Sequence, residues 1–173
     1  MAVSNDALGG RKFSSGIGRK AIMAKKLSHI DAAGNASMVD VSTKPKVRRT
    51  ARAKGKIILA QKTLELIAKN ALEKGDCLSV ARIAGIAAAK KTASLIPLCH
   101  NIEIDHITVD ITPAADGMEI EATATCVGKT GIEMEAITAV SVAAITIYDM
   151  CKAVDKNMRI EGISLLEKTK NEI

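Results

Sequence analysis

Two periodicities in the hydrophobic positions divide this chain into strands and helices. Apolar residues alternate with polar ones from Ile102 to Ile111 and again from Met118 to Ala124, on either side of Asp116-Gly117, a pattern typical of a β-hairpin. The apolar segment that follows predicts a long helix over 135–154. A last strand is predicted over 159–166.

The part of the chain before the hairpin is predicted to form one short strand and two helices. Residues 27–56 have the composition of a loop, and Ile57–Ala60 is predicted as a short strand. Apolar residues at helical spacing predict a helix over 63–74, with Gly75 at its C′ position, and a second helix over 78–96 that stops before a proline. The order strand, helices, two strands, helix, strand indicates an α+β fold, an antiparallel sheet with helices on one face.

The composition is that of an ordinary globular protein with few aromatic residues. Of 173 residues, 47% are hydrophobic and 25% are charged, whereas aromatic residues reach only 1%. The core must therefore be built from Ala, Ile, Leu, Val and Met, and a flat aliphatic face of such side chains favours an oligomer. Residues 1–27 are polar and show no sustained period, so we predict a flexible N-terminal tail followed by a single domain over 28–173.

A net charge of +6 and a pI near 9.2 favour an anionic partner, which is a nucleic acid, a phosphorylated ligand or a membrane surface. The scarcity of aromatic side chains argues against single-stranded nucleic acid, because bases need stacking platforms. No uninterrupted apolar run reaches the ~18 residues of a membrane span. Because no secretory signal is evident near the start, we expect a cytoplasmic protein with no membrane partner.

The four cysteines are predicted to be buried free thiols, because no two of them form a CxxC pair and all lie in apolar surroundings. Cys99-His100 and His106 do not have a common zinc-ligand spacing. We therefore predict no metal site.

The turn Gly128-Lys129-Thr130 carries half of a phosphate-loop motif. The full motif needs a glycine where the chain has Thr123. The sequence therefore argues against a P-loop nucleotidase, although the backbone N–H groups of such a turn can receive an anion.

Two pairs of ionisable residues mark the ends of the long predicted helix. Asp149 and Lys152 lie three residues apart and hence on one face. They form either a surface ion pair or a half-buried pair with coupled, shifted pKa values suited to proton transfer, which we favour because the flanking residues are apolar. Glu133 and Glu135 either compensate the helix dipole or, if extended, point the same way and accept the N–H groups of a guanine-like edge.

These two pairs are too far apart to serve one small ligand within one chain. Glu135 and Asp149 are separated by roughly 21 Å along a helix. Either the two pairs serve different sites, or two subunits bring opposite helix ends together, and we favour the shared site. On the residues alone, His100 and Lys74 are more readily explained as structural side chains, and Arg49 with its basic neighbours is either a solvated face or a polyphosphate clamp.

Six blocks of the sequence, spread over about residues 27–168, resemble the cyclic pyranopterin monophosphate synthase family of molybdenum cofactor biosynthesis. They are Ser28-His29-Ile30-Asp31 with Gly34, Met38–Ser42, Lys74-Gly75-Asp76, Ala81–Ile86, Ile96–His100 and Gly128–Lys152. Their number and common order make this resemblance specific.

The resemblance implies a ferredoxin-like fold with one added helix, assembled as a homohexamer of three dimers with active sites at the dimer interfaces. It implies a lyase that converts 3′,8-cyclo-7,8-dihydroguanosine 5′-triphosphate (cyclised dihydro-GTP), made by a preceding radical SAM enzyme, into cyclic pyranopterin monophosphate with release of pyrophosphate. We predict no resident cofactor, and whether Mg²⁺ accompanies the triphosphate stays open.

The resemblance also implies roles for individual residues. The family's catalytic acid falls on Asp149, and its essential lysines fall on Lys74 and Lys152. The substrate-contact and pocket positions fall on Leu98, Cys99, His100, Met134 and Glu135, with Glu133 beside them, and on Asp40 and Arg49. Arg48 is an alternative to Arg49, because the residues around it depart from the family pattern.

Two other functions compete with the enzyme hypothesis. One is a nucleic-acid-binding module that uses the basic stretch Lys44–Lys56, although we predict no nucleic-acid partner. The other is a regulatory subunit that binds a nucleotide without turnover.

Overall fold

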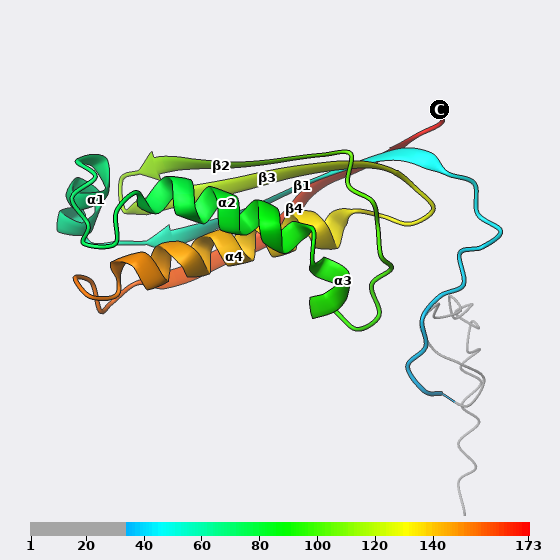
Figure 1. The fold of residues 1–173 in the computed structure, drawn as a ribbon, viewed down its shortest axis with the longest axis horizontal. Coiled ribbons are helices and arrows are strands. Elements are labelled where there is room, and N and C mark those ends of the chain that lie inside the picture. The colour runs from blue at the N-terminus through cyan, green and yellow to red at the C-terminus, as the bar shows by residue number, and fades with distance from the viewer. Residues whose placement is uncertain (1–33) are drawn as a thin grey trace, which may run out of the picture.

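The computed structural model describes residues 34–173 and shows a four-stranded antiparallel sheet with helices on one face (Figure 1). The tail predicted over 1–27 and the predicted start of the domain at residue 28 lie outside the described residues. The elements are β1 (Val47–Ile58), α1 (Gln61–Ala68), α2 (Cys77–Ala89), α3 (Thr92–Leu95), β2 (His106–Ala114), β3 (Gly117–Gly128), α4 (Glu133–Cys151) and β4 (Arg159–Asn171). The strand order β2-β3-β1-β4 is consistent with a ferredoxin-like arrangement, which confirms the α+β prediction.

Strand β1 begins much earlier than the sequence predicted, so the prediction of a loop up to Lys56 was wrong. Its inward positions include Ala51, Ala53 and Gly55, whose small side chains gave little hydrophobic signal. A Cβ at Gly55 would lie 2.7 Å from Cγ1 of Val140 in α4. The small inward residues of β1 therefore let α4 pack close to the sheet.

Helix α4 is the central element of the helical layer and was predicted well. Ten of its 19 residues are buried, and the small ones among them let α2 pack beside it. A Cβ at Gly85 of α2 would lie 2.8 Å from the carbonyl oxygen of Ala139. By length and composition alone α4 could cross a membrane, a property that buried core helices share, and here its ten buried residues face the core.

The two helices predicted before the hairpin are shorter than expected. Helix α1 ends at Ala68, so Asn70 (φ 49°) lies next to its end, whereas Gly75 (φ 84°) lies further along the chain, just before α2. The Asp76 carboxylate accepts the N–H of Ser79 at 3.0 Å and caps α2. The predicted second helix is interrupted at Lys90-Lys91 and continues only as the short α3.

The hairpin β2–β3 is confirmed, with Ile111 opposite Ile120 in its register. Strand β4 extends to Asn171, five residues beyond the predicted end, because its polar last residues pair with β1 at the sheet edge.

All four cysteines are free, and Cys77, Cys126 and Cys151 are buried. These elements build one core between the sheet and the pair α2 and α4.

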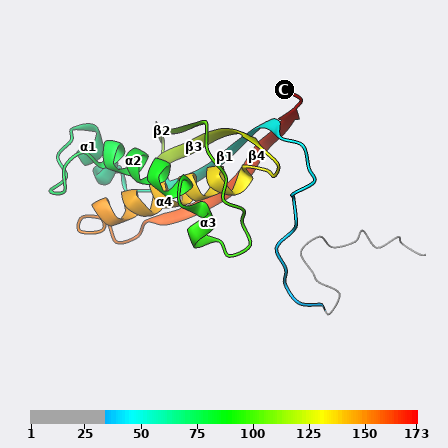
Figure 2. The same cartoon turned by 45° about the vertical axis from the view of Figure 1, so that its right-hand side comes forward.

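The fold is elongated along α4, so the two ends of this helix lie at opposite ends of the molecule. Figures 1 and 2 show α3 and the start of α4 at one end and α1 at the other. The end of α4 lies on the α1 side. The fold therefore separates the two halves of the predicted site.

Candidate active site

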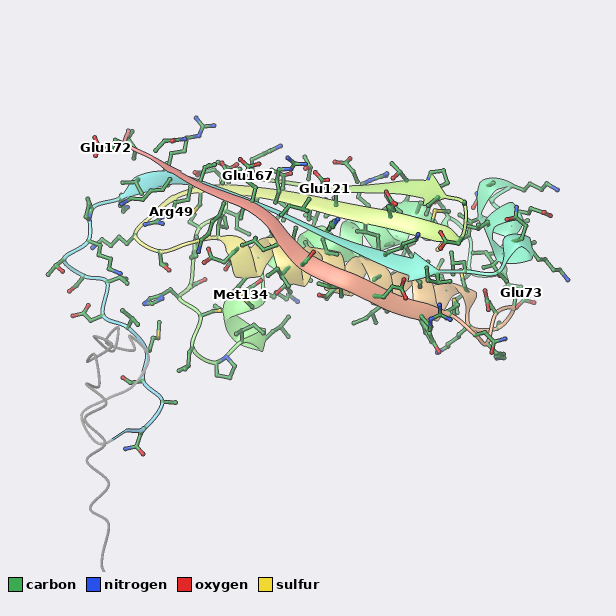
Figure 3. All side chains as sticks on the ribbon, turned by 180° about the vertical axis from the view of Figure 1, so that it is seen from behind. Arg49, Glu73, Glu121, Met134, Glu167 and Glu172 are labelled. Atoms are coloured by element: carbon green, nitrogen blue, oxygen red, sulfur yellow. The ribbon has the colours of Figure 1, made fainter. Side chains whose placement is uncertain are left out.

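The predicted site residues form two groups at opposite ends of α4. We call Lys74, Asp149 and Lys152 the charged triad. The other group lies around the start of α4, on the side where Figure 3 labels Met134 and Arg49, while Glu73, the neighbour of Lys74, is labelled at the far end. Because Glu135 and Asp149 both belong to α4, roughly 21 Å separates them along the helix. No single small ligand spans both groups within one chain.

A cavity of about 250 Å³ contains six of the predicted residues. Its walls come from the segment after α3, from the start of α4 and from the irregular segment before β1. They are Val39, Val41, Lys44, Leu98, Cys99, His100, Ile102, Thr130, Gly131, Glu133, Met134 and Glu135. Asp40 lies between two lining residues, and its carboxylate accepts the N–H of Ser42 at 2.8 Å.

The local backbone explains how the cavity is positioned. The N–H of Cys99 donates to the carbonyl oxygen of Ile96 at 3.0 Å, which turns the chain after α3 toward the start of α4. His100 Nε2 is hydrogen-bonded to the carbonyl oxygen of Val39 at 2.7 Å. A Cβ at Gly131 would collide with the Glu133 carboxylate, so a side chain at this position would displace that carboxylate from where it now lies.

Glu135 is a buried carboxyl whose Oε2 has no hydrogen-bond partner among the described residues. The residue is 3% exposed, and burial raises the pKa of its carboxyl, with the nearby charge of Glu133 raising it further. Glu133 and Glu135 are not extended, because both lie in the first turn of α4, so the condition under which their carboxylates were to point the same way is not met. Glu133 is more exposed than Glu135, yet both line the same cavity.

Arg49 and Lys168 support the cavity from the sheet. Arg49 donates from Nε to the carbonyl oxygen of Gly128 at 3.1 Å and from Nη2 to that of Lys129 at 3.2 Å. Lys168 of β4 lies 3.4 Å from the Glu133 carboxylate. Arg49 is half-buried, and its two hydrogen bonds hold the turn before α4. Arg48 is exposed and does not line the surface between β1, β4 and the start of α4, which Arg49 does.

The charged triad forms a compact cluster in which one carboxylate bridges two ammonium groups. Lys74 Nζ lies 2.6 Å from Asp149 Oδ2, and Lys152 Nζ lies 2.7 Å from Oδ1. Hydrogen bonds from Lys152 and Lys74 lower the pKa of Asp149 to about 2, and the hydrogen bond with Asp149 raises the pKa of Lys152.

The expectation of a half-buried pair with shifted pKa values at Asp149 and Lys152 agrees with the structure, but the shifts are away from neutral pH. Their side chains are 51% and 57% exposed. Because both side chains are half exposed to solvent, burial changes their pKa values little, and the ion pair moves the two pKa values away from neutrality. In a single chain, Asp149 is a carboxylate that fixes two cations.

Three of the seven basic residues in the stretch Lys44–Lys56 have acidic or carbonyl partners, and Arg49 is one of them. Arg52 lies 2.8 Å from Glu121 and 3.5 Å from Glu167, both labelled on the sheet in Figure 3. Lys56 lies 2.6 Å from Asp116. These carboxylates reduce the positive potential that nucleic-acid binding needs.

Sequence reasoning did not single out Lys44, Lys129 or Lys168 as site residues. Lys44 lines the cavity, Lys129 is hydrogen-bonded to Ser42 beside it, and Lys168 contacts Glu133. Their contacts join segments far apart in sequence, which no local pattern reveals. Among residues 34–173, no three His, Cys, Asp or Glu side chains converge as a metal site, and the absence of a resident metal stays a prediction.

Comparisons with known proteins agree on one family. The model of the MoaC family matches residues 38–171. A protein of Chloroflexus aggregans named cyclic pyranopterin monophosphate synthase is 57% identical over 145 residues, which are 83% of this chain and 88% of that protein. Cyclic pyranopterin monophosphate synthase 1 of Mycobacterium tuberculosis is 56% identical over 147 residues, covering 84% and 86% of the two chains. The mitochondrial cyclic pyranopterin monophosphate synthase of Arabidopsis thaliana is 53% identical over 146 residues, covering 83% and 54%.

Proposed function

The chain belongs to the MoaC family, and on this premise we propose that it is a cyclic pyranopterin monophosphate synthase of molybdenum cofactor biosynthesis. The enzyme is a lyase that converts cyclised dihydro-GTP into cyclic pyranopterin monophosphate and releases pyrophosphate. The substrate is supplied by a radical SAM enzyme. The observation that carries the proposal is 57% identity over most of both chains, together with a cavity that gathers six of the predicted site residues.

The cavity at the start of α4 is the proposed binding site for the guanine-derived ring. Its walls combine apolar side chains with the carboxyl groups of Glu133 and Glu135. A carboxylate accepts the ring N–H and the exocyclic amine of such a ring. Because Oε2 of Glu135 has no partner among the described residues, the ring supplies the missing hydrogen-bond donor.

The charged triad is the proposed centre for the phosphates and for proton transfer. Two ammonium groups fixed by Asp149 stabilise the charge that develops as pyrophosphate leaves. Ring opening and reclosure need several proton transfers, with Asp149, Lys74 and Lys152 as the proposed donors and acceptors. Covering the triad with a partner subunit adds desolvation, which moves the pKa values of Asp149 and Lys152 back toward neutrality.

A dimer formed through the helical layer brings the two halves together. Ile83 of α2 is 67% exposed, and Ile145 and Tyr148 of α4 are 56% and 37% exposed. Antiparallel pairing of two α4 helices about a two-fold axis near Val142, the midpoint of α4, places the triad of one chain beside the cavity of the other. Three such dimers make the proposed hexamer. The proposed location is the cytoplasm.

The test is turnover of cyclised dihydro-GTP, followed by mass spectrometry of the product and by a pyrophosphate assay. Wild-type protein is expected to release pyrophosphate and form the cyclic phosphate, and Lys74→Ala or Lys152→Ala is expected to abolish both. Binding without turnover supports the regulatory-subunit alternative. Undiminished pyrophosphate release by both variants rules out the triad as the reaction centre.

A further inference from the structure

Residues 39–44, which we call the strap, form one wall of the cavity without belonging to a helix or strand. Val39, Val41 and Lys44 line the cavity. The strap has a shape of its own, because the Asp40 carboxylate accepts the N–H of Ser42 and the N–H of Lys44 donates to the carbonyl oxygen of Val41 at 3.1 Å. Figure 2 shows this stretch of chain before β1 running along the α3 end of the molecule.

Two side chains from distant parts of the chain attach the strap to the rest of the molecule. His100 Nε2 is hydrogen-bonded to the carbonyl oxygen of Val39, at one end of the strap. Lys129 Nζ donates to the carbonyl oxygen of Ser42 at 2.6 Å, near the other end. The acceptors are backbone carbonyls, so these bonds fix where the strap lies rather than which side chains it carries.

The ammonium of Lys129 is itself held in position and acts on the strap electrostatically. Arg49 donates to the carbonyl oxygens of Gly128 and Lys129 and so fixes the turn from which this lysine extends. Hydrogen bonds from Ser42 lower the pKa of the Asp40 carboxyl, and the positive charge of Lys129 lowers it further. The ammonium group of Lys129 therefore holds the strap by a hydrogen bond to Ser42 and also attracts the Asp40 carboxylate of the strap.

We propose that Lys129 is a positioning residue that closes the strap over the cavity, and that the substrate enters when this attachment opens. The inference rests on the proposed function and deepens it. With the strap closed, Val39 and Val41 cover the ring and Lys44 adds an ammonium group to the site. With the strap released, the cavity loses that wall and binds its ligand less tightly.

The experiment measures steady-state kinetics and hydrogen–deuterium exchange of the full-length protein. Lys129→Met removes the donor while keeping the aliphatic side chain, and Lys129→Arg keeps a charged donor. Loss of a partly exposed hydrogen bond from a charged donor is expected to change an equilibrium constant about tenfold. Lys129→Met is therefore expected to raise KM about tenfold with kcat within twofold, and to speed exchange in residues 38–45 but not in α4. Lys129→Arg restores both, and Lys62→Met, an exposed lysine of α1, changes neither.

Three results overturn the inference. Wild-type KM and wild-type exchange in Lys129→Met show that the bond does not hold the strap. A fall in kcat with unchanged exchange places Lys129 in the chemistry rather than in positioning. Failure of Lys129→Arg to restore exchange shows that the effect was not loss of a donor. If wild-type protein does not turn over the substrate, the proposed function fails, and the exchange comparison still decides the strap.

Discussion

Ile145→Lys tests whether the outer face of α2 and α4 is a subunit interface. Ile145 is 56% exposed in the single chain, although ten of the 19 residues of its helix α4 are buried. Fully burying such a side chain contributes about 1.5–3 kcal/mol, so covering the exposed half of Ile145 contributes about half of this in each copy. A two-fold interface contains the residue twice, and the loss therefore totals about 1.5–3 kcal/mol.

This loss corresponds to roughly a 10- to 100-fold weaker dimer, before the cost of burying the new charge. Sedimentation velocity over a concentration series measures the dissociation, and a pyrophosphate assay on the same samples measures activity. We expect both to fall together and activity to recover as the protein concentration rises. Ile173→Lys, at a C-terminal residue that is 81% exposed, is the matched control and should alter neither. A dissociated Ile145→Lys protein with full activity would refute the reasoning.

Two further predictions concern single charges. Asp149→Asn should lower kcat by about 100- to 10,000-fold, as expected for loss of a proton-transfer group, while thermal unfolding changes little because the side chain is 51% exposed; a variant that retains activity would contradict the proposed role. The pKa of Glu135 is raised in the folded protein, so the folded state binds this proton more tightly than the unfolded state does. In the Ile145→Lys variant, where no partner covers the cavity, the free energy of unfolding should therefore fall as the pH rises from the ordinary pKa of a glutamate through the raised pKa of Glu135. Glu135→Gln should flatten this fall in thermal unfolding scans between pH 4 and pH 8, and an unchanged slope would show that Glu135 does not cause it.

The sequence predicted the elements with a strong hydrophobic period and missed those without one. Helix α4 and the hairpin carry large apolar residues at regular spacing, and both were found. Strand β1 was missed because Ala51, Ala53 and Gly55 face the core, and small residues there reflect the close approach of α4, which is a tertiary property. The side-chain directions of Glu133 and Glu135 could not be predicted, because they depend on whether α4 begins at residue 133 or 135.

The site was predictable where one element carries its parts and unpredictable where distant segments meet. The ion pair between Asp149 and Lys152 follows from helical spacing, and so does the separation of Asp149 from Glu135. The bond from Lys74 to Asp149 joins residues 75 positions apart, and that from Lys129 to Ser42 joins residues 87 positions apart. Such contacts are set by how the sheet and helices pack, so residue type alone does not indicate them.

The central claim is that each active site takes its cavity from one chain and its charged triad from another. Glu135→Gln and Lys152→Ala, each expected to be inactive alone, are mixed by unfolding and refolding them together in equal amounts. Half of the dimers formed at random are mixed, and one of the two sites in each mixed dimer carries neither substitution. The account predicts recovery of about a quarter of the wild-type rate of pyrophosphate release. A mixture no more active than the separate variants would contradict it.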